Sequence, residues 1–189
     1  MKNKINLKNY FYKLSSIFLK VKVSKSKEIG LEKAIKEVII EIKRRKRKGK
    51  LIIIGNGGSA SIASHFAIDL WKNARIKAMT FNEATLLTCI SNDYGYDSVF
   101  KKPIEVFMEK EDLLFAISSS GRSRNILEGV LQAKEKKCKI ITLSGFSPLN
   151  PLRKIGDINF YVPSNSYGFV ELAHSIICHF IVDLISNYE

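Results

Sequence analysis

Two apolar segments that each end in a glycine- and serine-rich loop constrain the fold of this 189-residue chain more than any other feature. Residues 51–54 are all apolar and lead into Gly-Asn-Gly-Gly-Ser at 55–59. Residues 113–117 are equally apolar and lead into Ser-Ser-Ser-Gly-Arg-Ser at 118–123. A helical spacing of apolar residues follows each loop, so the sequence predicts two strand–loop–helix units.

Both loops have the composition of an anion site. Backbone N–H groups at a helix start, with hydroxyls beside them, bind phosphate. The first loop lacks the Gly-x-Gly-x-x-Gly spacing of a dinucleotide site and the lysine of a P-loop. Plain turns with ordinary serine caps are the simpler alternative. Two such loops in one domain favour a ligand with a phosphate at one end and hydroxyls along its length, such as a sugar phosphate.

Strand-like and helix-like segments alternate along the chain from residue 51 onward. Repeated βα units imply a parallel sheet with helices on both faces, and ligands bind beyond the carboxyl ends of its strands. We therefore predict an α/β fold with a three-layer, doubly wound parallel sheet, preceded by N-terminal helices. Strands are expected at 51–54, 77–81, 113–117, 139–143 and 158–162, and helices at 59–73, 84–90, 123–136, 150–155 and 169–186.

An N-terminal helical segment, residues 1–48, is predicted to precede the α/β domain at 49–189. Apolar residues recur with helical spacing over 7–21 and 28–47, and the residues between them, 22–27, read as a polar turn. The apolar stripes of these helices need a partner, which could be another subunit.

The excess positive charge lies entirely in this leading segment. Residues 1–50 hold 17 Lys and Arg against 4 Asp and Glu, which equals the net charge of +13 for the whole chain. The densest run, residues 43–48, could bind nucleic acid or acidic lipid, or it could be a solvated helix end where cations suit the helix dipole. We favour the helix end over a nucleic-acid partner, because no aromatic residues interleave with the run.

The composition predicts a cytoplasmic protein without a membrane span. No run of eighteen apolar residues occurs, and the N-terminus lacks the order of a signal peptide. The three cysteines, Cys89, Cys138 and Cys178, are scattered, which fits reduced thiols and gives no zinc-type spacing.

The three histidines lie in two predicted helices. His65 and Asp69 are four residues apart, a spacing that suits two metal ligands, an acid/base pair or a surface hydrogen bond. Glu171, His174 and His179 lie in an apolar stretch, where a buried histidine with a backbone partner is the structural alternative. A straight helix places Glu171 and His179 about 12 Å apart. They could therefore ligate one metal only if the helix begins after Glu171, or if sites are shared between subunits.

Taken together and in order, five motifs resemble the SIS (sugar isomerase) domain with its flavodoxin-like sheet, and within it the phosphoheptose isomerase family. The motifs lie at 55–60, 64–67, 91–95, 117–123 and 171–179. The resemblance implies the aldose–ketose isomerisation of sedoheptulose 7-phosphate to D-glycero-D-manno-heptose 7-phosphate, which feeds heptose synthesis for surface polysaccharide such as lipopolysaccharide. It also implies a homotetramer with active sites between subunits and one Zn²⁺ per active site.

The resemblance also assigns roles to residues of this sequence. The catalytic acid/base pair falls on Asp69 and His179. Asp69 stands where the family has Glu, and Glu171 stands where it has Gln. The implied metal ligands are His65, Asp69, Glu171 and His179, and the implied substrate-binding residues are Asn56, Gly57, Gly58, Ser59, Asp93, Ser118, Ser119, Ser120, Ser123 and Glu171.

Two readings without catalysis compete with the enzyme. One is a binding protein of the replication-initiator-associating type, which keeps the SIS fold; the other is a phosphosugar sensor without turnover. The polar residues at 65, 69 and 179 argue against a non-catalytic scaffold, because a scaffold needs no polar cluster at the ligand cleft. Metal content discriminates the scaffold from the isomerase, since only the isomerase should purify with zinc or respond to it.

Overall fold

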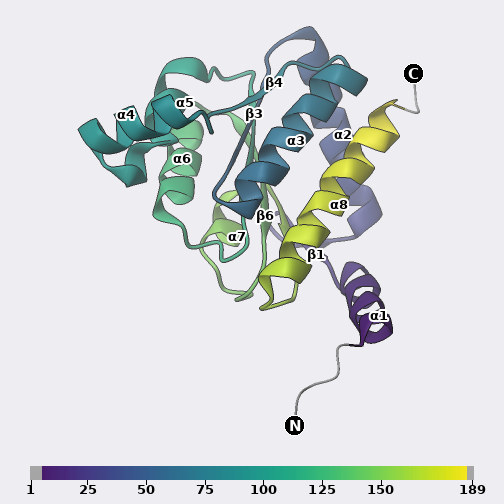
Figure 1. The fold of residues 1–189 in the computed structure, drawn as a ribbon. Coiled ribbons are helices and arrows are strands. Elements are labelled where there is room, and N and C mark those ends of the chain that lie inside the picture. The colour runs from purple at the N-terminus through teal and green to yellow at the C-terminus, as the bar shows by residue number, and fades with distance from the viewer. Residues whose placement is uncertain (1–5, 187–189) are drawn as a thin grey trace.

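A seven-stranded, mostly parallel sheet organises the computed structural model, which describes residues 6–186 (Figure 1). The strand order is β2-β1-β7-β6-β5-β3-β4, in which β3 to β7 pair in parallel and β1 and β2 form an antiparallel edge. Every residue of β3 and β5 is buried, as expected for central strands covered on both faces. The strands are β1 (Lys22–Ser24), β2 (Glu28–Ile29), β3 (Leu51–Gly55), β4 (Ala78–Thr80), β5 (Leu113–Ser118), β6 (Lys139–Ser144) and β7 (Ile158–Tyr161).

Helices cover both faces of the sheet, which confirms the predicted three-layer architecture. Figure 1 shows α2, α3 and α8 on one face, and their buried side chains share one apolar core with the sheet. A second core lies under α4 to α7 on the opposite face. The helices are α1 (Leu7–Phe18), α2 (Leu31–Arg47), α3 (Gly58–Asn73), α4 (Ala84–Tyr94), α5 (Lys101–Phe107), α6 (Arg124–Glu135), α7 (Leu152–Ile155) and α8 (Tyr167–Ser186), with a 3₁₀ turn η1 at Tyr96–Ser98.

The predicted polar turn at 22–27 is confirmed only at 25–27, because residues 22–24 form β1, which lies between β2 and β7. Val23 lies opposite Phe160 of β7 and is buried, so the segment extends the sheet. A three-residue strand is too short to give a recognisable alternation, and its pairing comes from a strand far along the chain. The following helix accordingly begins at Leu31 rather than at 28, and α5 and η1 were not predicted at all.

The apolar stripe of α2 packs within its own chain. Ala34, Ile35, Val38 and Ile42 are buried in the core beneath α2 and α8. By contrast, α1 has no buried residue and contacts α8 at its start, where the Tyr10 ring lies over Phe169. The boundary at residue 48 therefore remains a prediction, although α2 belongs to the same core as the sheet.

The basic run at 43–48 forms the end of α2, in line with the helix-end interpretation. Arg45 is buried; its guanidinium donates to the carbonyl oxygens of Glu41 and Glu111 and pairs with the Glu41 carboxylate. Lys48 forms an ion pair with the Glu111 carboxylate at 2.9 Å. Part of the run is therefore used to attach α2 to the loop before β5.

Helix α8 is the one helix among residues 6–186 that is long and apolar enough to cross a membrane by length and composition. It packs against α2 and α3 and buries eight of its residues in the fold. It also carries Glu171, His174 and His179. These contacts make α8 a core helix of this domain.

Candidate active site

A pocket of about 280 Å³ lies at the carboxyl ends of β3 and β5, where the two predicted loops meet. Because β3 and β5 are neighbouring parallel strands, the loops that follow them emerge side by side. Every predicted substrate residue except Asp93 lines this pocket, and Ile117 and Tyr167 join them without having been predicted. The lining residues are Asn56, Gly57, Gly58, Ser59, Ile117, Ser118, Ser119, Ser120, Ser123, Tyr167 and Glu171.

Two helices begin at this pocket. Helix α3 begins at Gly58, after Gly57 whose φ of 52° lies in the left-handed region that favours glycine. Helix α6 begins at Arg124, directly after Ser123. The partial positive charge of both helix starts suits an anion. Glu171 is the one charged side chain among the lining residues, so attraction for an anion must come from backbone and hydroxyl groups.

The serine loop is shaped by its own hydroxyls. The N–H of Gly121 donates to Ser118 Oγ at 3.2 Å, and the N–H of Arg122 donates to Ser120 Oγ at 3.2 Å. The hydroxyls of Ser118 and Ser123 lie 3.4 Å apart. The buried hydroxyl of Ser119 has no hydrogen-bond partner among the described residues, although it lines the pocket. A ligand that supplies an acceptor oxygen would satisfy this hydroxyl.

A pair of asparagine side chains connects the first loop to helix α6, which begins directly after the serine loop. Asn56 of the first loop and Asn125 of α6 exchange two hydrogen bonds of 2.9 Å each. The hydroxyl of Tyr96 in η1 donates to Asn56 Oδ1 at 3.3 Å. Neither Asn125 nor Tyr96 was predicted. The sequence indicates Asn125 only weakly, because a polar residue in the first turn of a helix is as often exposed to solvent as buried.

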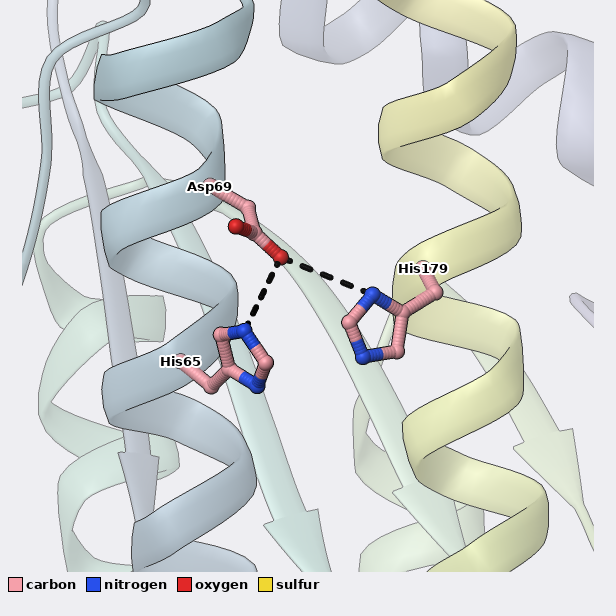
Figure 2. Close-up of side chains that lie close together, drawn as sticks. All are labelled: His65, Asp69 and His179. Carbon is pink, nitrogen blue, oxygen red and sulfur yellow. Dashed lines mark ion pairs between the residues drawn. The ribbon is translucent and has the colours of Figure 1, made fainter.

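His65, Asp69 and His179 form a second cluster, between α3 and α8 (Figure 2). Asp69 Oδ2 lies 3.5 Å from His65 Nε2 and 3.5 Å from His179 Nδ1. The two histidine side chains are 61% and 46% exposed, whereas that of Asp69 is 15% exposed. One potential ligand atom from each residue lies within 4.8 Å of the others. Two imidazoles and a carboxylate at this spacing form a donor set that suits Zn²⁺.

Glu171 lies in the pocket at the ends of β3 and β5, which we call the anion pocket after its predicted ligand, and it lies outside this cluster. Helix α8 begins at Tyr167, so the alternative that the helix starts after Glu171 is wrong. A Cβ atom added to Gly58 would lie 2.4 Å from Glu171 Oε2, which shows how closely the carboxylate covers the start of α3. Glu171 and His179 are therefore two helical turns apart on one helix. The four predicted metal ligands are not assembled within one chain.

Asp93 lies outside the pocket within this chain. It sits near the end of α4, where Asn92 Nδ2 donates to its Oδ1 at 2.9 Å. The thiol of Cys89 lies 3.8 Å from its Oδ2. Its predicted contact with substrate stays a prediction.

His174 is the buried histidine with a backbone partner that the sequence offered as the structural alternative. Its ring is fully buried, and Nε2 lies 3.3 Å from the carbonyl oxygen of Ser144. Burial lowers the pKa of His174 to about 4, so the ring is neutral at neutral pH. His174 thus supports the fold, and the pocket and the cluster lie before and after it along α8.

Known proteins resemble this chain over most of its length. Residues 9–145 match a family described as the SIS domain. The chain is 34% identical over 166 residues to a phosphoheptose isomerase of Helicobacter pylori strain ATCC 700392 / 26695, with 84% of this chain and 86% of that protein covered. It is 36% identical over 173 residues to a phosphoheptose isomerase of Aliarcobacter butzleri strain RM4018, with 88% and 89% covered. A solved phosphoheptose isomerase from Neisseria gonorrhoeae superposes with a TM-score of 0.83 at 26% identity, covering 96% of this chain and 97% of that one.

Proposed function

This chain belongs to the SIS-domain family and, within it, to the phosphoheptose isomerases, and we propose that it converts sedoheptulose 7-phosphate to D-glycero-D-manno-heptose 7-phosphate. One observation carries the proposal. The same two helices, α3 and α8, bear an anion pocket at their N-terminal ends and a His–Asp–His cluster two to three turns further along. A phosphosugar isomerase needs both an anchor for the phosphate and an acid/base pair for the other end of the sugar.

The residues of the cluster suit the proton transfers of the isomerisation. A base removes a proton from C1 of the ketose and returns it to C2, and the hydroxyl proton moves from O1 to O2. We assign the carbon-bound proton to the carboxylate of Asp69 and the oxygen-bound proton to His179. The 3.5 Å between Asp69 Oδ2 and His179 Nδ1 keeps the two groups within reach of adjacent carbons.

We propose that His65, Asp69 and His179 also hold a Zn²⁺ ion, as the chemistry of this donor set allows. A bound zinc ion supplies a Lewis acid that stabilises negative charge on a substrate oxygen. Glu171 completes the set only if a second copy of the chain supplies it, since within one chain it lies in the anion pocket.

The surface around the cluster supports a homotetramer with active sites shared between subunits. His65 and His179 are open to solvent, and the two helices that carry them, α3 and α8, also bear exposed apolar side chains. Exposed apolar side chains on neighbouring helices are typical of an interface between subunits. The apolar residues concerned are Ile68, Trp71, Ile176 and Phe180.

The proposed setting is the cytoplasm, in heptose synthesis for surface polysaccharide. Free thiols at Cys89, Cys138 and Cys178 agree with a reducing compartment. The relatives named above, at 34–36% identity, are phosphoheptose isomerases, which favours the enzyme over the non-catalytic alternatives.

The proposal is tested by incubating the purified protein with sedoheptulose 7-phosphate and following aldose formation by NMR, with and without zinc or a chelator. Product that appears, is lost with chelator and returns with zinc supports the isomerase and its metal. Product that persists after complete chelation contradicts the metal alone. No product from folded, tetrameric, zinc-loaded protein contradicts the proposed substrate.

A further inference from the structure

The asparagine pair Asn56–Asn125 joins the first loop of the pocket to the start of α6, and the proposed chemistry assigns no role to this contact. Asn125 is only 2% exposed and lies in the first turn of α6, whereas Asn56 lines the pocket. A buried amide is costly unless its polar atoms are satisfied. Here the two amides satisfy each other, so their orientations are coupled.

The orientation of Asn125 is determined by the backbone. The N–H of Ile126 donates to Asn125 Oδ1 at 3.0 Å, and an N–H donor requires an oxygen opposite it. Asn125 Nδ2 must therefore be the atom that faces Asn56.

The orientation of Asn56 follows from that of Asn125. Asn125 Nδ2 donates to Asn56 Oδ1, and Asn56 Nδ2 donates to Asn125 Oδ1. The Tyr96 hydroxyl adds a second donor to Asn56 Oδ1. The oxygen of the Asn56 amide thus accepts from two donors, and one of its two N–H groups donates to Asn125. The second N–H of this amide is used by none of these contacts.

We propose that Asn125 is a positioning residue, which holds Asn56 so that its remaining N–H donates to an oxygen of the bound phosphosugar. A reversed Asn56 amide would turn its carbonyl oxygen toward the ligand and repel anionic oxygens. The inference rests on the proposed function for the identity of the ligand. Its physical content is that Asn125 acts on the ligand only through Asn56, and that Tyr96 supports the same orientation.

A double-mutant cycle measures whether Asn125 acts through Asn56. The variants are Asn56→Ala, Asn125→Ala and the double variant, each titrated calorimetrically with sedoheptulose 7-phosphate and with inorganic phosphate. Loss of one hydrogen bond to the ligand should weaken binding roughly tenfold in Asn56→Ala and about fivefold in Asn125→Ala. The double variant should bind within about twofold of Asn56→Ala, because contacting residues that act as a unit are not additive.

Thermal unfolding of each variant measures how much the substitution destabilises the fold, so that this effect can be separated from its effect on ligand binding. If Asn125 served only to stabilise the fold, its removal would weaken binding equally with and without Asn56. Effects that add in the double variant, or an Asn125→Ala protein that binds both probes as tightly as the wild type, would overturn the inference.

Tyr96→Phe keeps the test decisive if Asn125→Ala does not fold. Tyr96 is 54% exposed, so losing its hydroxyl should not disturb the core. Binding should weaken about threefold, and only when Asn56 is present. Tyr94→Phe is the matched control, since Tyr94 is also an exposed tyrosine of this segment and has no contact with Asn56 among the described residues. Equal binding by Tyr96→Phe and Tyr94→Phe would contradict the role of Tyr96.

The two probes show which end of the ligand Asn56 meets and keep the inference apart from catalysis. Weakened binding of both probes assigns the N–H to a phosphate oxygen, and weakened binding of the sugar phosphate alone assigns it to a sugar oxygen. A non-additive cycle in a protein without turnover supports the inference while contradicting the isomerase. A wild-type protein that binds neither probe overturns both.

Discussion

Acidification should lower the free energy of unfolding of this protein through one residue, the buried His174. Desolvation lowers its pKa to about 4 from 6.5, and the hydrogen bond to Ser144 opposes this shift without cancelling it. Because Ser144 offers a carbonyl oxygen, the neutral ring carries its proton on Nε2, which leaves Nδ1 without a partner among the described residues. Protonation would therefore place a charge and an unpaired N–H in the core.

The sign and size of the effect follow from proton linkage. The folded-state pKa lies below the unfolded value, so between these pH values the unfolded chain binds more protons. The stabilisation from keeping the ring neutral is complete above about pH 6.5 and is lost as the pH falls toward 4. A shift of this size corresponds to about 3 kcal/mol in total, of which about 2 kcal/mol is lost on going from pH 7 to pH 5.

Urea unfolding, followed by circular dichroism, measures the contribution of His174 to the pH dependence of stability when the wild type is compared with His174→Gln. Glutamine can still donate an N–H to the Ser144 carbonyl but does not titrate. Other groups titrate alike in both proteins, so their effects cancel in the difference. Chelator and a fixed protein concentration exclude metal and subunit linkage. The stability advantage of the wild type over His174→Gln should be about 2 kcal/mol greater at pH 7 than at pH 5. An advantage that is the same at both pH values would refute the argument from burial.

Three further substitutions test the site and its loops. Asp69→Asn should abolish turnover without unfolding the protein. The control is Asp183→Asn, at an exposed position of α8, which should keep activity. Undiminished activity in Asp69→Asn would exclude Asp69 as the base. Glu171→Gln removes the one charge among the residues that line the anion pocket. Calorimetry should therefore show that inorganic phosphate binds several-fold more tightly, a difference on the order of 1 kcal/mol. Unchanged binding would mean that the carboxylate does not face the anion. Gly121→Ala should lower the free energy of unfolding by about 2 kcal/mol or more, because φ is 62° and the added Cβ would lie 2.1 Å from a buried amide oxygen. Gly30→Ala, where a Cβ meets nothing within 4 Å, is its control, and equal stability of the two variants would show that the loop relaxes freely.

The sequence by itself determined the βα framework and the position of the pocket between the two loops. Apolar runs at 51–54 and 113–117, followed by glycine and serine, are local patterns that define a strand and the turn after it. Since parallel strands place their carboxyl ends at one edge, the meeting of the loops at 55–59 and 118–123 followed from topology. The pairing of His65 with Asp69 was equally local, because four residues make one turn of a helix.

Only the tertiary structure decided which distant side chains meet. His179 reaches Asp69 because α8 packs beside α3 on one face of the sheet, and no spacing within the sequence encodes that contact (Figure 2). The same packing separates Glu171 from the cluster and places it on the glycine loop. Asn125 acquires its partner, Asn56, from the first loop, and the strand at 22–24 exists only by pairing with β2 and β7. Local periodicity determines which face of an element is apolar, whereas the register between elements depends on how complete side chains fit together in the core.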